Sequence, residues 1–273
     1  MNVLEVEQLE VTFFHGKEGN KVVKDVSFAM KEGEIVGIVG ESGSGKTQTS
    51  LAIMQLLNET AAITGGTIRF CGNEISSYTE KKMQEIRGKE IGMIFQEPMT
   101  ALNPVHRIGQ QIEESLKLHT NLSKLERKKR AMEVMKLVEL PNPEIIYHQY
   151  PHQLSGGMRQ RIMIASALIM EPKLLIADEP TTALDVTIQA QILTLLKKIN
   201  QEKKLSILFI SHDLGVIHKL CHRVVVMKEG KKMEEGDVEE VFHFPKEDYT
   251  KELLQAIPTR RMSFRKRRKE GVQ

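Results

Sequence analysis

The chain has 273 residues, of which 40% are hydrophobic and 27% charged, and its formal net charge is +3. This composition is typical of a soluble globular protein that can bury a sizeable core. No segment approaches the roughly 18 consecutive apolar residues of a membrane-spanning helix, and residues 1–5 lack the pattern of a signal peptide, so we expect the chain to stay where it is made.

The first third of the chain is rich in Val, Ile, Phe and Thr, which favours short β-strands. We predict three strands, at residues 3–13, 22–30 and 67–76, with turn residues such as Gly72 and Asn73. The connections between such strands are short, and short connections favour antiparallel pairing.

A glycine-rich loop follows an apolar run at residues 35–39 and precedes a predicted helix. The loop matches the pattern G-x-x-x-x-G-K-[ST] in full, through Gly40, Glu41, Ser42, Gly43, Ser44, Gly45, Lys46 and Thr47. Glycines let backbone amides point at phosphate groups, and the positive end of the following helix faces them. Lys46 supplies a charge for the β- and γ-phosphates, and Thr47 offers a hydroxyl to Mg²⁺.

The alternative reading of this loop is a glycine-rich turn in an unrelated sheet. The strand before it and the helix after it are the context that phosphate binding requires. The sequence therefore predicts that the chain binds a nucleoside triphosphate, and we include Gln48, which follows the loop, among the nucleotide-binding residues.

The middle of the chain, residues 96–151, reads as a mostly helical insert. Ser123 and Glu126 have the spacing of a capping box at a helix start. An apolar stripe with helical spacing follows, at Ala131, Val134, Met135 and Val138.

The last third alternates strands with helices. We predict strands at residues 173–177 and 206–210, and a hairpin that begins at residues 224–227 and turns at Glu229 and Gly230. One helical face between them carries Ile188, Ile192, Leu195, Leu196 and Ile199. This alternation predicts an α/β fold with a parallel sheet whose faces are covered.

Two acidic residues end the apolar strand near residue 177. Carboxylates at the end of a buried strand need a partner or a metal ion, and in a parallel sheet this end opens onto the ligand crevice. Asp178 can reach Mg²⁺ and Glu179 can orient an attacking water. The alternative is a helix start, because Asp and Glu ahead of Pro180 also favour one.

Four further motifs resemble those of ABC ATPases and occur in that family's order. Leu154-Ser155-Gly156-Gly157-Met158 resembles the LSGGQ signature, Gln96 the Q-loop glutamine, Ala183-Leu184-Asp185 the D-loop, and His212 the switch histidine. The resemblance covers essentially the whole chain. It implies a P-loop cassette with a mixed sheet core, an antiparallel β subdomain and a helical insert.

The resemblance also implies roles for these residues. Two cassettes of the family sandwich ATP head to tail, so Ser155, Gly156 and Gly157 would bind the partner's nucleotide, with Asp185 nearby. Glu179 would be the general base of hydrolysis, His212 would hold the γ-phosphate and water, and Gln96 would sense Mg²⁺ and nucleotide. Phe13 is the candidate for stacking on adenine; it is equally compatible with a place in the core.

Several stretches are similar to the ATPases of peptide and nickel importers, namely residues 96–104, 150–161, 178–191 and 249–258. Met158, where most ABC proteins carry Gln, resembles the first of the two ATPases in such importers. The chain ends without the cysteine-rich extension of many oligopeptide members, which favours nickel or metallophore importers. The expected partners are two permease subunits, a second related ATPase or a second copy, and indirectly a solute-binding protein.

The resemblance implies a position on the cytoplasmic side of the membrane, as a peripheral subunit. Other ABC classes remain as alternatives: a DNA-repair protein, a translation factor or an exporter. Repair proteins carry a long coiled coil between phosphate loop and signature, and translation factors carry two cassettes, whereas this chain has neither pattern. We therefore predict an importer ATPase at residues 1–258, with a helical subdomain at about 97–155.

Residues 259–273 form a basic tail. Residues 260–273 contain seven Lys and Arg and one Glu, a net charge of +6, which leaves −3 for the rest of the chain. The acidic body argues against a nucleic-acid partner. We expect a disordered, solvated tail; contact with anionic lipid headgroups is the alternative. Cys71 and Cys221 have no metal-ligand spacing and suit a reducing compartment.

Overall fold

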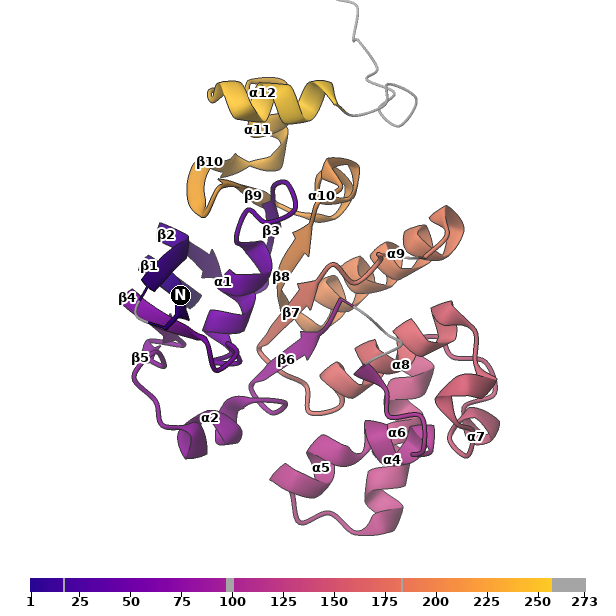
Figure 1. The fold of residues 1–273 in the computed structure, drawn as a ribbon. Coiled ribbons are helices and arrows are strands. Elements are labelled where there is room, and N and C mark those ends of the chain that lie inside the picture. Colours follow the sequence, from indigo (N-terminus) through magenta and orange to yellow (C-terminus); the bar gives the residue numbers. More distant parts are fainter. Residues whose placement is uncertain (17, 97–100, 183, 257–273) are drawn as a thin grey trace, which may run out of the picture.

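Two β-sheets form the framework of the protein (Figure 1). The computed structural model describes residues 1–16, 18–96, 101–182 and 184–256. The first sheet has the order β2-β1-β4-β5 and is antiparallel, as predicted. Its strands are β1 (Asn2–His15), β2 (Glu18–Lys31), β4 (Ala61–Phe70) and β5 (Asn73–Glu74).

The prediction of a single strand at residues 67–76 was wrong in its bounds. β4 begins at Ala61, and the chain turns back at Cys71 and Gly72, whose φ angles are +48° and +79°. The early part of β4 was missed because Gly65 and Gly66 read as a strand breaker. The pair instead sits at an irregularity in the pairing with β1, where a Cβ on Gly66 would lie 2.3 Å from the carbonyl oxygen of Gln8.

The second sheet has the order β10-β9-β3-β8-β7-β6. Its first five strands in chain order are parallel, and β10 pairs with β9 in an antiparallel hairpin at the edge. The strands are β3 (Ile35–Val39), β6 (Ile91–Ile94), β7 (Leu174–Asp178), β8 (Ser206–Ser211), β9 (Arg223–Lys228) and β10 (Lys231–Asp237). The predicted parallel sheet and hairpin are confirmed.

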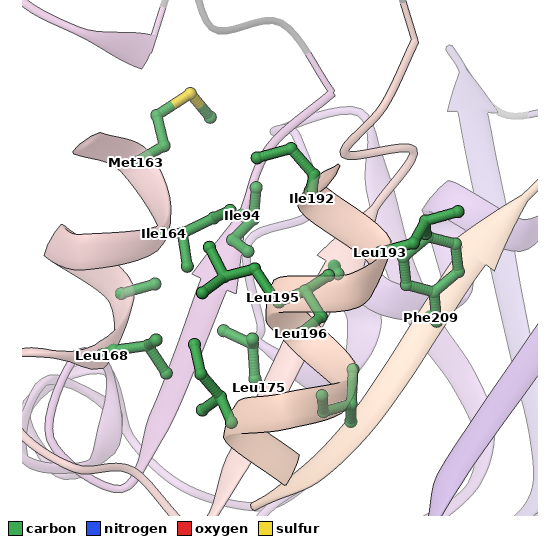
Figure 2. Packing of buried hydrophobic residues seen from close by; sticks show 14 of the residues in the cluster. Ile94, Met163, Ile164, Leu168, Leu175, Ile192, Leu193, Leu195, Leu196 and Phe209 are labelled. Carbon is green, nitrogen blue, oxygen red and sulfur yellow. The ribbon is translucent and has the colours of Figure 1, made fainter. Parts of the chain in front are cut away.

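Both faces of the second sheet are covered by apolar side chains. Alternate residues of a strand point to opposite faces: Ile38 of β3 joins a cluster with Ile53 of α1 (Lys46–Ile53) and the first sheet, while Val39 joins a cluster with the helices of the other face. Figure 2 shows this second cluster, where α8 (Gly156–Leu168) and α9 (Val186–Lys203) pack on β6, β7 and β8.

Among the described residues between β6 and α8, four helices follow Arg107. They are α4 (Ile108–Ile112), α5 (Glu114–His119), α6 (Lys124–Leu137) and α7 (Pro143–Ile146), and a 3-10 turn, η1 (Pro151–Gln153), precedes α8. The capping box at Ser123 and Glu126 is confirmed. The four residues of the predicted apolar stripe are all buried and belong to the same cluster as α8 and α9.

The further described helices are α2 (Glu80–Ile86), α10 (Leu214–Leu220), α11 (Val238–His243) and α12 (Asp248–Gln255). α10 packs on the parallel sheet, where a Cβ on Gly37 of β3 would lie 2.8 Å from Cδ1 of Ile217, and Figure 1 shows α11 and α12 beside β10. Among the described residues, none of the helices combines the length and the apolar character of a membrane span. The basic tail, Ala183, and residues 97–100 of the importer-like stretch lie outside the described residues.

Candidate functional site

The phosphate loop, His212, the two carboxylates and Gln96 follow four neighbouring parallel strands. In the order β3-β8-β7-β6, the strands end at the phosphate loop, at His212, at Asp178 and Glu179, and just before Gln96. Because the carboxyl ends of parallel strands meet at one edge of the sheet, segments up to about 170 residues apart in the chain converge there.

The phosphate loop closes tightly against its surroundings. Gly43 and Gly45 have φ angles of +80° and +98°, in a region that favours glycine. Gly40 has no room for a side chain, because a Cβ there would lie 2.1 Å from the carbonyl oxygen of Met227 and 2.7 Å from Oγ of Ser44. The glycines of the motif are therefore required by the backbone path as well as by access to a ligand.

Polar groups of the loop fit a phosphate ligand. The Lys46 ammonium is buried and donates hydrogen bonds to the carbonyl oxygens of Gly40 and Glu41, both at 2.8 Å. Burial lowers the pKa of Lys46, while the carboxylates of Glu179 and Asp178 oppose that effect. Oγ of Ser44 is buried without a hydrogen-bond partner among the described residues, and a phosphate oxygen would satisfy it.

Asp178 is buried between two hydroxyl groups. It is 2% exposed, and its carboxylate accepts hydrogen bonds from Thr47 Oγ1 at 3.2 Å and Ser50 Oγ at 3.1 Å. Burial raises the pKa of Asp178, and the bonds from Ser50 and Thr47 act in the opposite direction. A carboxylate beside a hydroxyl, both facing a phosphate loop, is a donor set that suits Mg²⁺.

Glu179 is the centre of a hydrogen-bond cluster. Its Oε2 accepts from Thr182 Oγ1 at 3.0 Å and from Gln96 Nε2 at 3.2 Å, and it lies 3.0 Å from Nδ1 of His212. The Glu179 side chain is 12% exposed and that of His212 is 58% exposed. The Glu179 backbone has a φ of +45°, and its N–H donates to the carbonyl oxygen of Ile210 on the neighbouring strand. This unusual backbone turns the side chain toward the loop edge.

The signature residues begin helix α8. Ser155 caps the helix, and its Oγ accepts from the N–H of Met158 at 3.3 Å. Gly157 packs closely on α9, since a Cβ there would lie 2.9 Å from Cγ2 of Ile188. Among the hydrogen bonds of the described residues, none joins Ser155, Gly156 or Gly157 to the phosphate loop of the same chain.

The profile of the family described as "ABC transporter" matches residues 23–182, more than half of the chain. This chain belongs to the ABC transporter family. Its ATP-binding members are ATPases coupled to transport, and the α/β cassette fold predicted from the sequence is confirmed.

Similar ABC proteins match almost the whole chain. "Probable peptide ABC transporter ATP-binding protein y4tR" of Sinorhizobium fredii is 46% identical over 95% of this chain and 78% of its own length. Oligopeptide transport ATP-binding protein OppD of Bacillus subtilis is 50% identical, over 94% and 72%. For the glutathione import ATP-binding protein GsiA of Escherichia coli K12, 47% identical, the match spans 94% of this chain but only 42% of the relative.

A solved ABC cassette has the same fold. The dimeric structure of MJ0796 in a post-hydrolysis state, bound to ADP and Pi, superposes with a TM-score of 0.77 at 32% identity. The match covers 86% of this chain and 98% of that one. The nucleotide-binding cassette fold is thus shared with a protein whose structure contains a hydrolysis product.

Three other predicted residues of this ABC cassette lie apart from the Glu179 cluster. Asp185 is exposed and caps α9, accepting from the N–H groups of Thr187 and Ile188 at 3.0 and 2.9 Å. Phe13 is half-buried in β1, opposite Asn20 and Ala61. Gln48 is half-buried in the first turn of α1. The roles predicted for them stay predictions.

Sequence reasoning missed Ser50 and Thr182. Both are hydroxyl residues that bond to the two carboxylates, and Ser50 is fully buried in α1. Thr182 stands three residues after Glu179, as in a short turn, and that spacing was the available signal. No sequence signal pointed to Ser50, because its partner, Asp178, lies 128 residues away.

Proposed function

We propose that this chain is the ATPase subunit of an importer for peptides, and that it hydrolyses ATP with Mg²⁺ at the edge formed by β3, β8, β7 and β6. The observation that carries the peptide class is the identity of 46% and 50% to proteins named for peptide and oligopeptide transport, over 94–95% of this chain. The sequence predicted peptides or nickel and metal chelates as cargo, and the short end favoured nickel or metallophores; the names of these relatives favour peptides.

The phosphate loop would hold the nucleotide. The amides of residues 43–47 and the Lys46 ammonium would bind phosphate oxygens, and Ser44 would gain the partner that its buried hydroxyl lacks. Thr47 and Asp178 would hold Mg²⁺, with Gln96 at its outer side. The ion neutralises phosphate charge when bound.

Glu179 would act as the general base that takes a proton from the attacking water. The cluster around it supports this role, because Gln96 and Thr182 donate to one carboxylate oxygen, which also lies 3.0 Å from His212 Nδ1, and these contacts fix the orientation of the group. His212 would hold the γ-phosphate and water from its half-exposed position. Thr182 would position Glu179 through its hydroxyl group.

A second cassette would complete the site. Ser155, Gly156 and Gly157 open a helix of 13 residues, and its amides suit a γ-phosphate held by the phosphate loop of the partner. Asp185 would lie at the same contact, Phe13 would stack on the adenine and Gln48 would line the nucleotide site. The partner would be a second related ATPase, with a second copy as the alternative.

A hollow between the two halves of the chain would receive a cytoplasmic helix of a permease. It has a volume of 280 Å³ and is lined by residues of β6, α4, α5 and α8, among them Met93 and Met163, and by Leu102. Leu56 and Phe95 at its border are 37% and 43% exposed, and exposed apolar side chains around a hollow support a protein contact. This contact would place the subunit at the cytoplasmic face of the membrane.

The proposal is tested by purifying the tagged chain from the membranes of its own cells in mild detergent and identifying the proteins that remain bound. We expect two permeases and a second ATPase. The complex is then reconstituted with its solute-binding protein, and ATP hydrolysis is measured with peptides, glutathione or nickel chelates. Stimulation by peptides supports the proposal; stimulation by nickel chelates alone, or recovery without permeases, would overturn it.

A further inference from the structure

The outer side of the phosphate loop is in contact with helix α12. The hydroxyl oxygen of Tyr249 accepts a hydrogen bond from the N–H of Glu41 at 3.3 Å, although the residues are 208 positions apart. Tyr249 is 6% exposed. The ammonium of Lys228, at the end of β9, lies over the Tyr249 ring, 4.4 Å from its centre.

Helix α12 is itself firmly docked. The carboxylate of Glu234 on β10, which is 8% exposed, accepts hydrogen bonds from the N–H groups of Lys246 at 2.9 Å and Glu247 at 3.2 Å, just before α12 begins. Thr250, one residue after Tyr249, is completely buried. A buried carboxylate that binds two amides fixes the start of the helix and therefore the position of the Tyr249 ring.

The hairpin between β9 and β10 holds the loop at a second point. The N–H of Gly230 donates to the carbonyl oxygen of Ser44 at 3.1 Å, and the carbonyl oxygen of Gly230 accepts from Lys24 N–H at 2.7 Å. The C-terminal unit, β9, β10 and α12, thus binds the phosphate loop at two points, Glu41 and Ser44.

The contact at Glu41 affects the shape of the loop when Lys46 binds a phosphate instead of the loop backbone. The Lys46 ammonium binds the carbonyl oxygens of Gly40 and Glu41, and phosphate oxygens compete for the same ammonium. When Lys46 turns to a phosphate, the Glu41 peptide keeps two contacts, the Ser44 N–H bond to its carbonyl oxygen at 3.2 Å and the Tyr249 bond to its N–H.

We propose that Tyr249 is a positioning residue for the phosphate loop, and that the docking of α12 thereby sets the affinity of the cassette for nucleotide. The residue touches the backbone of the loop and leaves the reacting atoms to other groups. The inference rests on the proposed binding of ATP by this loop. It predicts that the hydroxyl group of Tyr249 changes ATP binding while the rate at saturating ATP stays the same.

The test compares Tyr249→Phe with Tyr78→Phe in the full chain. Phenylalanine keeps the ring and its contact with Lys228 but removes the hydroxyl group. Tyr78 serves as the control, because a lysine also lies over its ring, with Lys82 Nζ 5.0 Å from the ring centre, and it is half-buried and not in contact with the loop. For each variant we measure the Kd for ATP with Mg²⁺, the KM and kcat of ATP hydrolysis, and the rate of amide hydrogen exchange at Glu41 without nucleotide.

We expect Tyr249→Phe to weaken ATP binding and raise KM by about two- to tenfold, the effect of one neutral hydrogen bond, with kcat unchanged. Exchange at Glu41 should accelerate by a similar factor. Wild-type ATP affinity and exchange in Tyr249→Phe, or equal changes in Tyr78→Phe, would overturn the inference. If the wild-type chain does not bind ATP, the proposed function is wrong. The exchange rate at Glu41 would still show whether the Tyr249 hydroxyl group orders the loop.

Discussion

Replacing Glu179 by glutamine changes the charge of the central carboxylate and little else. Glutamine has nearly the same volume, and its amide oxygen can still accept from Thr182 and His212, which now bond to Oε2 of the glutamate. Glutamine cannot accept a proton from water. A positioned general base contributes about 10²- to 10⁴-fold to a rate, so the barrier of hydrolysis should rise by about 3–5 kcal/mol.

Binding of ATP should survive this change. The carboxylate of Glu179 is a source of negative charge near Lys46, and its removal takes away a competitor for the phosphates. We therefore expect ATP affinity at or above that of the wild type, and accumulation of an ATP-bound dimer. The assay combines phosphate release at saturating ATP and Mg²⁺ with the Kd for ATP and size-exclusion chromatography.

The control is Glu171→Gln, an acidic side chain that is 69% exposed and paired with Lys203 at 3.3 Å. It should hydrolyse ATP at the wild-type rate. Turnover by Glu179→Gln within about threefold of the wild type, where a factor of 10² is the smallest expected effect, would refute the assignment of Glu179 as the base.

Three further changes probe the site and its support. Lys46→Ala should weaken ATP binding by about 10- to 100-fold, because hydrogen bonds to charged groups are lost; undiminished affinity in calorimetry contradicts the loop assignment. Gly40→Ala places a methyl group 2.1 Å from the carbonyl oxygen of Met227 and should cost about 1–3 kcal/mol of unfolding free energy, so an unchanged unfolding temperature would count against the geometry. Burial alone would raise the pKa of Glu234, but the hydrogen bonds from the backbone N–H groups of Lys246 and Glu247 hold it below its usual 4.5. The carboxylate therefore stabilises the fold above that pH, and the stabilisation is lost as pH falls through the lower folded value. The stability lost in Glu234→Gln, measured by urea unfolding, should be full at pH 7 and shrink below about pH 4.5; a loss that stays constant with pH would be inconsistent with this.

Local patterns made the phosphate loop and the helices predictable. The loop is specified by eight consecutive residues, and the strand and helix beside it follow from neighbouring apolar positions. The stripe on α9 could be predicted because its five apolar residues have helical spacing. Four of the five are buried in the structure. β4 was placed too late because Gly65 and Gly66 look like a breaker when the pairing with β1 is unknown.

Contacts between residues far apart in the chain could not be predicted from the sequence. Ser50 and Thr182 are common residue types whose importance comes from the carboxylate opposite. Tyr249 was noted as part of an importer-like ending, but its bond to Glu41 spans 208 positions and follows from the docking of α12 on β10. The signature at Ser155 was recognisable as a motif, while the nucleotide that it would bind belongs to another subunit.

The place of β8 in the sheet bears on how the protein is made. β8 lies between β3 and β7, yet the ribosome produces it after both, and its last residue is Ser211. At about 5–20 residues per second, roughly 10 to 35 seconds separate the phosphate loop from the end of β8. During that time β3 has an unpaired edge, and β7 has one from its own synthesis until β8 is made; such edges can join other chains. The nascent chain is therefore exposed to aggregation until β8 inserts, and ATP can add its binding energy to the fold only after most of the chain has left the ribosome.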